Sequence, residues 1–400
     1  MNICMVGNLP QVYGGVATHC YYLTKNLVSL GHTVFLLDVI PYAEKNLPEG
    51  VKFIEFTQYP LSYLLILFVR QKKYRILTLQ LIRIVGLHRL KNIRFATSLI
   101  LNLQNNLENQ TIDVIHSHHI GIRSLAAYLF AKAHQIPFIM TAHGAEITVE
   151  ENWQKEKRLI THLLDTNRQI ITVSKFTAKI IREKGFAGKL TVIPNGIDME
   201  AFQEIPEDIV SIRQKYKIPE DKKMILFLSS FKNWKGPDVY LRSLPFVKQP
   251  FHGIMVGNDL GYWNSCQKLA KELDLQEKVG MYRNIPSNEV VAMYHIADVF
   301  VFPTKFPSEG FGIVALEAMA TSTPVVASRI AAIPEIVKNG ITGLLFEPNN
   351  HVDLAAKINQ ILSDPALGQQ LRENGIRKVR TSFNWKRIAE QVQKVYKEII

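Results

Sequence analysis

The residues best suited to chemistry in this chain are two carboxylates near its end. Glu309 and Glu317 lie eight residues apart in the stretch SEGFGIVALEAMATSTP, residues 308–324. Between them, Gly310-Phe311-Gly312 forms a predicted turn that opens an apolar helix ending near Met319. The first turn of a helix offers unpaired amide hydrogens and a positive dipole end, and both attract phosphate. Eight helical residues span at most about 12 Å, so the pattern indicates a pocket for a sugar joined to a diphosphate.

Each carboxylate has a second interpretation when it is taken alone. Glu309 could do no more than complement the helix dipole, and Glu317 could be a solvated helix residue. The amino-acid sequence on either side of the pair weighs against these interpretations. It reads AMYHIADVFVFPTKFPSEGFGIVALEAMATSTPVVAS, followed by IPEIVKNGITGLLFEPNN.

This sequence resembles the C-terminal half of the retaining glycosyltransferases of the GT-B fold, group 1 type, whose signature is two glutamates with seven residues between them. The resemblance extends over essentially the whole chain. It implies an α/β protein of two Rossmann-like domains that face an interdomain cleft, with a C-terminal helix that crosses back to the N-terminal domain. It also implies a nucleotide-diphosphate sugar as donor, with a UDP-sugar favoured, and neither a metal nor another cofactor.

The resemblance assigns roles to individual residues. Glu309, His143 and Lys235 are the expected catalytic residues: Glu309 and His143 would hold the sugar ring, and Lys235 would neutralise the diphosphate. Glu317 would bind the ribose. The remaining residues expected to bind the donor are Gly15, Ser230, Lys232, Gly310, Phe311, Gly312 and Ile313.

The chain departs from the family pattern at several positions. The family often has Gly-Arg where Ser229-Ser230 stand here, so the arginine that partners Lys235 is absent, and we hypothesise that Lys232 replaces it. Ser322, Arg283 and the pair Ala331-Ala332 stand where glycines are usual. These departures leave open the hypothesis that the pocket for the base or the sugar is altered.

The N-terminal half reads as strands followed by polar turns. Residues 2–7 are a predicted strand, and Gly14-Gly15 precedes a predicted helix over 16–30, a weak glycine-loop signal by itself. His116, His118 and His119 follow another strand. Three histidines could suggest a metal, but no carboxylates accompany them in sequence, and we expect no metal site. His143 could alternatively be a capping histidine in a loop.

Composition restricts the class of protein. A chain of 400 residues favours two domains, and three cysteines without close spacing predict neither a disulfide framework nor a zinc knuckle. We expect a reducing, cytoplasmic location. The chain begins with a strand-like segment rather than a secretory signal, and its longest apolar run, residues 59–69, is too short to span a bilayer. No nucleic-acid-binding module is visible.

The net charge of +12 is concentrated in one segment. Residues 56–107 contain no Asp or Glu and carry eight cations, among them Arg70, Lys72, Lys73 and Arg75. Basic residues interleaved with Leu and Ile at helical spacing are typical of helices that lie on an anionic membrane surface. The alternative is a structural helix whose apolar side packs on the sheet. We favour membrane contact, so these four cations are candidates for the membrane and acceptor surface.

The sequence thus predicts three parts. They are an acceptor domain over 1–198 that includes the basic segment 56–107, a nucleotide-sugar domain over 199–382, and a crossover helix over 383–400. The expected activity is a retaining, hexosyltransferase-type reaction with a glycan or lipid-linked acceptor at the cytoplasmic face of a membrane. A sugar-nucleotide epimerase of the same architecture, or a non-catalytic glycosyltransferase-like subunit, remains as an alternative.

Overall fold

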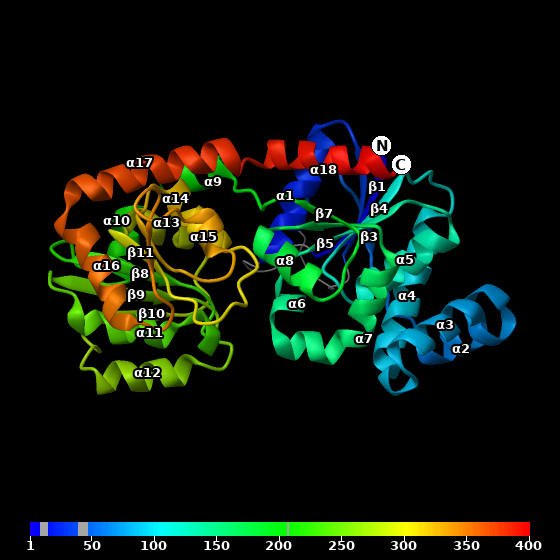
Figure 1. Cartoon of the computed structure of the whole chain (residues 1–400), viewed down its shortest axis with the longest axis horizontal. Helices are drawn as coiled ribbons and strands as arrows, with labels where there is room; N and C mark the ends of the chain where they lie inside the picture. Colours follow the sequence, from blue (N-terminus) through cyan, green and yellow to red (C-terminus); the bar gives the residue numbers. More distant parts are fainter. Residues whose placement is uncertain (9–14, 39–46, 206–207) are drawn as a thin grey trace. The chain divides into compact units, whose positions relative to one another are not determined.

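The structure is a computed structural model that describes residues 1–8, 15–38, 47–205 and 208–400 (Figure 1). Gly14 of the predicted glycine loop lies outside these residues. The contacts divide the chain into two compact units, Met1–Gly196 with Trp385–Ile400, and Ile197–Asn384. These limits differ by two residues from the domain boundaries that the sequence suggests.

The described part of the first unit contains seven parallel strands in the order β3-β2-β1-β4-β5-β6-β7. Both faces of this sheet are covered, which explains why its strands are nearly continuous apolar runs. Side chains of β1 alternate between two cores: Ile3 and Met5 face α1 and α18, whereas Cys4 and Val6 face the layer of α4, α5 and α7. The strands are β1 (Asn2–Gly7), β2 (Thr33–Asp38), β3 (Lys52–Glu55), β4 (Val114–His118), β5 (Phe138–Ala142), β6 (Gln169–Thr172) and β7 (Lys189–Val192).

The helices of the first unit include the last helix of the chain. Helix α18 (Trp385–Ile399) packs on α1 through a buried stripe of Trp385, Ile388, Val392 and Tyr396, and the Tyr396 hydroxyl lies 2.6 Å from His116 Nδ1. The crossover of this helix to the first unit is therefore confirmed. The other helices are α1 (Gly15–Ser29), α2 (Leu61–Arg70), α3 (Lys72–Val85), η1 (Leu87–Arg89), α4 (Leu90–Leu107), α5 (Ile122–Ala133), α6 (Ala145–Thr148), α7 (Glu150–Thr166) and α8 (Lys175–Glu183).

The basic segment 56–107 has two structural parts. Helix α4 buries most of its length in the core, and two cations at its N-terminal end are bonded within the protein: Arg94 donates to the Tyr59 carbonyl, and Arg89 pairs with Glu156. For α4 the membrane prediction is wrong, because its apolar side packs on the sheet layer. Helices α2 and α3 instead expose apolar side chains. Among the described residues, no helix is both long and apolar enough to cross a bilayer.

The second unit repeats the plan with six parallel strands in its described part, in the order β10-β9-β8-β11-β12-β13. The strands are β8 (Lys223–Leu228), β9 (Phe251–Val256), β10 (Val279–Tyr282), β11 (Val299–Phe302), β12 (Val325–Ser328) and β13 (Leu344–Phe346). The helices are α9 (Met199–Gln203), α10 (Ile209–Lys215), η2 (Asn233–Lys235), α11 (Pro237–Ser243), η3 (Leu244–Phe246), α12 (Trp263–Glu272), α13 (Ser287–Ile296), α14 (Ile313–Ala320), α15 (Ile333–Ile336), α16 (His351–Ser363) and α17 (Pro365–Ser382).

Both sheets reverse their strand order at one point, between β1 and β4 in the first unit and between β8 and β11 in the second. In open parallel sheets, ligands bind outside the carboxyl ends of the strands at such a point, because the connections leave to opposite faces there. The loops that follow β1, β4, β8 and β11 are therefore the places to look for a site in each unit.

Candidate functional site

The loops after β8 and β11 bring together two of the residues predicted to be catalytic. Lys235 lies at the end of η2, and its Nζ is 2.5 Å from Oε2 of Glu309. Both side chains are mostly buried, with 17% and 14% of their surface exposed. The Lys235 ammonium also lies 4.2 Å from the centre of the Trp234 ring. A mostly buried cation fixed in this way is well placed to act on an anionic group, because little solvent screens it.

Close backbone packing holds these two loops together. Gly236 has a φ of 73°, and a Cβ at this position would lie 1.9 Å from the Pro303 carbonyl oxygen, so only glycine fits. Lys305 adds two links, because its amide donates to the Trp234 carbonyl and its ammonium lies 3.1 Å from the Asp238 carboxylate. Sequence reasoning did not single out Lys305.

The turn after Glu309 leads into α14 as the sequence predicts. Gly312 stands at the N-cap with a φ of 99°, and the helix begins at Ile313. The first amides of a helix have no acceptor one turn back, so those of Ile313 and Val314 are available to an anion, whereas the Ala315 amide donates to the Gly312 carbonyl. The Phe311 side chain is buried, and the centre of its ring lies 6.0 Å from that of Phe383. The Phe311 side chain is therefore taken up by the core of the second unit.

Glu317 is not a solvated helix residue. It is only 3% exposed, and its Oε2 accepts a hydrogen bond of 2.9 Å from the Tyr294 hydroxyl. Burial raises the pKa of Glu317 to about 7, against the opposing effect of this hydrogen bond. The carboxyl group can therefore change its protonation state near neutral pH.

Of the remaining residues predicted to bind the donor, Ser230 and Lys232 lie in the loop after β8, and Gly15 lies at the start of α1 in the first unit. Ser230 follows β8, and its carbonyl accepts from the Lys232 amide. Lys232 is half-buried, and its ammonium makes no hydrogen bond or ion pair within the described residues. Gly15 is the exposed first residue of α1, and a Cβ added there would meet no described atom within 4 Å.

Two of the departures from glycine keep the backbone shape of glycine. Ser322 has a φ of 59° and Ala331 a φ of 53°, in the left-handed region that side chains disfavour. Ser322 and Ala331 therefore adopt a backbone conformation that glycine favours. Arg283 stacks its guanidinium 4.6 Å from the Trp263 ring centre and lies 3.7 Å from the Asp259 carboxylate.

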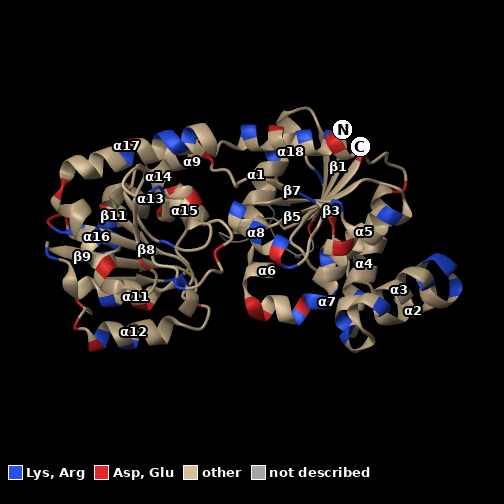
Figure 2. Cartoon of the chain, viewed as in Figure 1, with Lys and Arg blue, Asp and Glu red and all other residues tan. Residues whose placement is uncertain are grey.

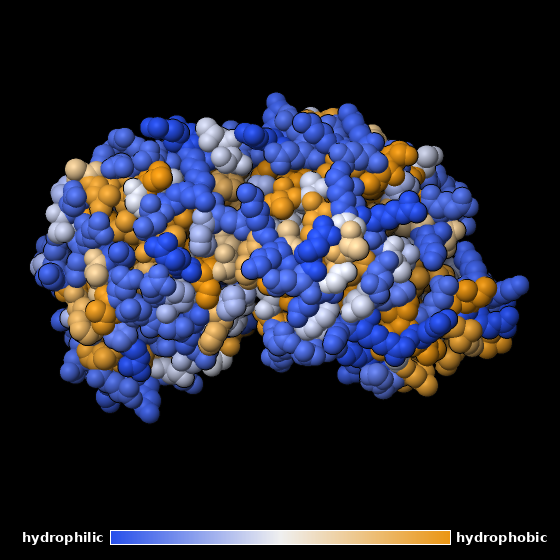
Figure 3. Space-filling model, viewed as in Figure 1, coloured by the Kyte–Doolittle hydropathy of each residue, from blue (hydrophilic) through white to orange (hydrophobic). Residues whose placement is uncertain are grey.

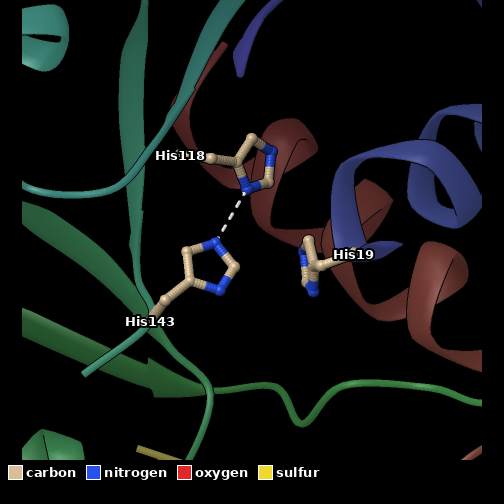
Figure 4. A group of neighbouring side chains, drawn as sticks. All are labelled: His19, His118 and His143. Carbon is tan, nitrogen blue, oxygen red and sulfur yellow. Dashed lines mark hydrogen bonds between the residues drawn. The ribbon is translucent and has the colours of Figure 1, made fainter. Parts of the chain in front are cut away.

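In the first unit, His143, which is partly buried, belongs to a cluster with the buried His19 and His118 at the carboxyl edge of the sheet (Figure 4). His19 comes from α1, His118 ends β4 and His143 follows β5. His118 Nδ1 lies 3.3 Å from His143 Nε2, and one nitrogen atom from each of the three rings lies within 4.8 Å of the other two. Burial, reinforced by the neighbouring imidazoles, holds the pKa of His118 and His143 well below 6.5, so both rings are neutral at physiological pH.

This cluster differs from the histidine set that the sequence suggested. His116 is held between Thr141 and Tyr396, with its nitrogen atoms 2.8 and 2.6 Å from their hydroxyl oxygens, and so links β4, β5 and α18. His119 has a φ of 84° just beyond the strand. Of those three residues, only His118 faces His143.

Sequence reasoning missed His19 and its partner Asn195, whose Oδ1 lies 2.7 Å from His19 Nδ1. A signal was present, because His19 shares the buried stripe of α1 with Leu23 and Leu27 at intervals of four residues. A histidine on such a stripe needs a buried partner. Tyr294, which bonds Glu317, carried no comparable signal.

Two family models match this chain. The model of the group 1 glycosyl transferases matches residues 208–378, and that of glycosyltransferase family 4 matches residues 13–201. The two matches follow one another along the chain and fall largely within the second and first units respectively.

Similar proteins cover between 71% and all of the chain. An uncharacterised glycosyltransferase of Methanocaldococcus jannaschii is 26% identical over 97% of this chain and 95% of its own length. The D-inositol 3-phosphate glycosyltransferase of Corynebacterium diphtheriae is 28% identical over 71% of this chain and 70% of its own. Among solved structures, HepE of Anabaena in complex with UDP-glucose has a TM-score of 0.80 at 19% identity, with both chains fully covered.

Proposed function

We propose that this chain, a glycosyltransferase of the GT-B fold, is a group 1 enzyme that transfers a sugar from a UDP-sugar with retention of the anomeric configuration. The observation that carries the proposal is the Lys235–Glu309 ion pair beside the start of α14. It combines a cation, free amides and a carboxylate at the carboxyl ends of β8 and β11. A diphosphate and a sugar ring need these groups.

The main task of the protein in this reaction is electrostatic. As the bond between the anomeric carbon and the diphosphate oxygen breaks, negative charge grows on the leaving diphosphate. Lys235 and the amides of Phe311 to Ile313 would stabilise this charge, and Lys232 would supply the second cation that Ser230 cannot. When a donor phosphate arrives, it would share Lys235 with Glu309. The reaction then needs no metal.

Retention follows if the acceptor attacks from the face that the diphosphate leaves. The acceptor oxygen bonds the anomeric carbon, and its proton passes to the departing phosphate oxygen. In this proposal Glu309 and His143 hold sugar hydroxyl groups, and Glu317 accepts a hydrogen bond from the ribose. A neutral His143 suits this role, because one ring nitrogen donates and the other accepts.

The comparisons support transfer over the alternatives. Both family models and the named relatives are glycosyltransferases, and HepE, a protein of the same fold, binds UDP-glucose. No observation favours an epimerase. A non-catalytic subunit would not need the ion pair that this chain retains.

A donor panel tests the proposal. The full chain is heated with UDP, UDP-glucose, other UDP-sugars and GDP-sugars. A donor at 100 times its Kd should stabilise the protein by about 2.7 kcal/mol. Lys235→Met should lower turnover by about 10²–10³-fold, whereas Lys268→Met on the exposed face of α12 should not. If no nucleotide sugar shifts the transition, the proposal is wrong.

Lys232→Ala tests the replacement of the missing arginine. Loss of the second cation should raise the donor KM or lower kcat sharply, with less effect on a donor-independent property such as Tm. Unchanged kinetics would show that Lys232 does not contact the diphosphate.

We also propose that the acceptor is a lipid-linked or membrane-bound glycan reached through α2 and α3. Nine of the nineteen large hydrophobic side chains that are exposed among the described residues lie between residues 61 and 90. Figure 3 shows hydrophobic patches over this region, and Figure 2 shows Lys and Arg but no Asp or Glu on α2 and α3. The nine are Leu61, Tyr63, Leu65, Ile66, Val69, Ile76, Leu79, Leu87 and Leu90.

An apolar surface with cations beside it fits an anionic bilayer, because the apolar groups enter the headgroup boundary and the cations meet lipid phosphates. Arg70, Lys72, Lys73 and Arg75 are all exposed. The cytoplasmic face is the proposed location, since the three cysteines of the chain are free and buried rather than paired.

Vesicle sedimentation tests this surface. The wild type should bind vesicles that contain phosphatidylglycerol and not pure phosphatidylcholine. At about 1 kcal/mol per cation, charge reversal at Arg70, Lys72 and Lys73 should weaken binding by roughly two orders of magnitude or more. Reversal of Lys268, Lys271 and Lys278 in the second unit is the control. Unaltered binding and unaltered lipid-acceptor activity in the first variant would reject the proposal.

A further inference from the structure

The histidine cluster contains polar atoms that the protein itself does not satisfy. Nε2 of His19 is buried and has no hydrogen-bond partner within the described part of the chain. Nε2 of His118 is likewise unpartnered, but the His118 atom that faces His143, and that would bind an ion, is Nδ1. Buried nitrogen atoms without partners are uncommon in folded proteins, because their desolvation is not compensated. A ligand that takes up imidazole nitrogens would remove this cost.

The orientation of His19 is fixed from behind. Its Nδ1 lies 2.7 Å from the Asn195 side-chain oxygen, and an oxygen can only accept, so Nδ1 carries the hydrogen. Nε2 of the neutral ring therefore carries a lone pair. Metal-binding histidines have this arrangement, in which an oxygen acceptor on one nitrogen orients the other towards the ion.

The spacing of the rings also suits a metal. Two nitrogens bound to tetrahedral zinc at about 2.0–2.1 Å lie about 3.3 Å apart, and His118 Nδ1 is 3.3 Å from His143 Nε2. The largest separation among the three ligand atoms is 4.8 Å, so a side-chain shift of about 1.5 Å would close the site on an ion.

We propose that His19, His118 and His143 bind a divalent transition-metal ion, zinc in the first place, through one nitrogen each, with a fourth position open to water. Three histidines and a water form a known type of zinc site. Figure 4 shows the three rings around a common space at the edge of the sheet. The ion is not part of the transfer chemistry.

The consequence is inhibition, and this step rests on the proposed function. If His143 holds the donor sugar, a zinc ion on His143 takes the nitrogen that the sugar hydroxyl needs. Zinc should then weaken binding of UDP-glucose but not of UDP, because UDP carries no sugar hydroxyl group for His143 to hold.

Titration calorimetry with zinc chloride on the chelator-treated full chain tests the site. The wild type should bind one ion that is lost in His19→Ala and in His118→Ala, with at least a 100-fold fall in affinity. His88→Ala, an exposed histidine on η1, should bind as the wild type does. Cobalt(II) should give the visible absorption of a tetrahedral ion in the wild type and in His88→Ala, but not in His19→Ala or His118→Ala. Equal binding by all four proteins, or none by the wild type, would overturn the proposal.

Asn195 gives a second test that leaves all three ligands in place. Asn195→Ala should weaken zinc binding by about 10–100-fold, and Asn195→Asp should restore it, because a carboxylate also accepts from Nδ1. Far-ultraviolet circular dichroism of the metal-free variants establishes that each is folded. Equal affinity in the Ala and Asp variants would show that Asn195 does not orient His19.

The two proposals fail separately. Zinc binding is measured without a donor, and binding of UDP-glucose is measured in chelator. Zinc binding without any nucleotide-sugar binding would leave the metal site standing and reject the proposed function. Zinc binding at the cluster with undiminished affinity for UDP-glucose would reject the inhibition.

Discussion

Replacement of Glu317 by glutamine should stabilise the protein in a way that depends on pH. Glu317 is buried in α14, and its only described hydrogen bond between side chains comes from Tyr294. Glutamine has nearly the same shape, and its side-chain oxygen can accept from the same hydroxyl, but it cannot ionise. The variant therefore isolates the cost of burying the charged form.

The magnitude follows from the pKa. Burial raises the pKa of Glu317 from 4.5 to about 7 in the folded protein. The folded state thus holds its proton more tightly than the unfolded state. The stability associated with the protonated group is present in full below pH 4.5 and is lost as the pH rises through 7. At about 1.4 kcal/mol per pH unit, the loss is about 3 kcal/mol.

Urea denaturation of wild type and Glu317→Gln between pH 4 and pH 8.5 measures this effect. The difference in unfolding free energy, variant minus wild type, should grow by about 3 kcal/mol across that range. Most of the rise should fall between pH 4.5 and 7. Glu277→Gln, at an exposed position before β10, should give a nearly constant difference. A constant difference for Glu317→Gln as well would refute the argument that its carboxyl is buried and costly to ionise.

Two further predictions concern backbone strain and the crossover helix. Ala331→Gly should raise stability by about 1 kcal/mol, because it removes the strain of a positive φ. The neighbouring change Ala332→Gly, at a φ of −79°, should lower stability by a similar amount. Thermal denaturation distinguishes the two variants, and a fall in Tm for both would contradict the reasoning. Tyr396→Phe leaves His116 Nδ1 buried without its partner and should lower the free energy of unfolding, measured in urea, by about 1–3 kcal/mol. The control Tyr21→Phe on α1 should lower it by less than about 0.5 kcal/mol. Equal effects would show that the hydrogen bond does not hold α18.

Much of the fold could be predicted because buried parallel strands have a strong local signal. The first strand is predicted and observed over Asn2–Gly7, and the turn before α14 lies where its two glycines indicate. The chemistry of the second unit was also visible, because Lys235 and Glu309 each stand in a loop directly after a strand. Residues at such positions converge at one edge of a parallel sheet whatever the details of packing.

The basic segment shows where local pattern fails. Helices α2, α3 and α4 all mix cations with Leu and Ile at helical spacing, yet α4 lies in the core while α2 and α3 expose their apolar side chains. An apolar stripe identifies a face that needs cover, but not what covers it. Only the packing of α4 against α5 and the sheet decided the matter.

The sequence by itself determined two parallel α/β units, the order of their elements and the residue types available at the strand ends, because these depend on short-range periodicity and turn chemistry. The tertiary structure alone decided which of those residues meet. His19, His118 and His143 come from three different elements, and Tyr294 reaches Glu317 from another helix. Such meetings are set by strand order and helix packing over long separations in the chain, and no local pattern encodes them.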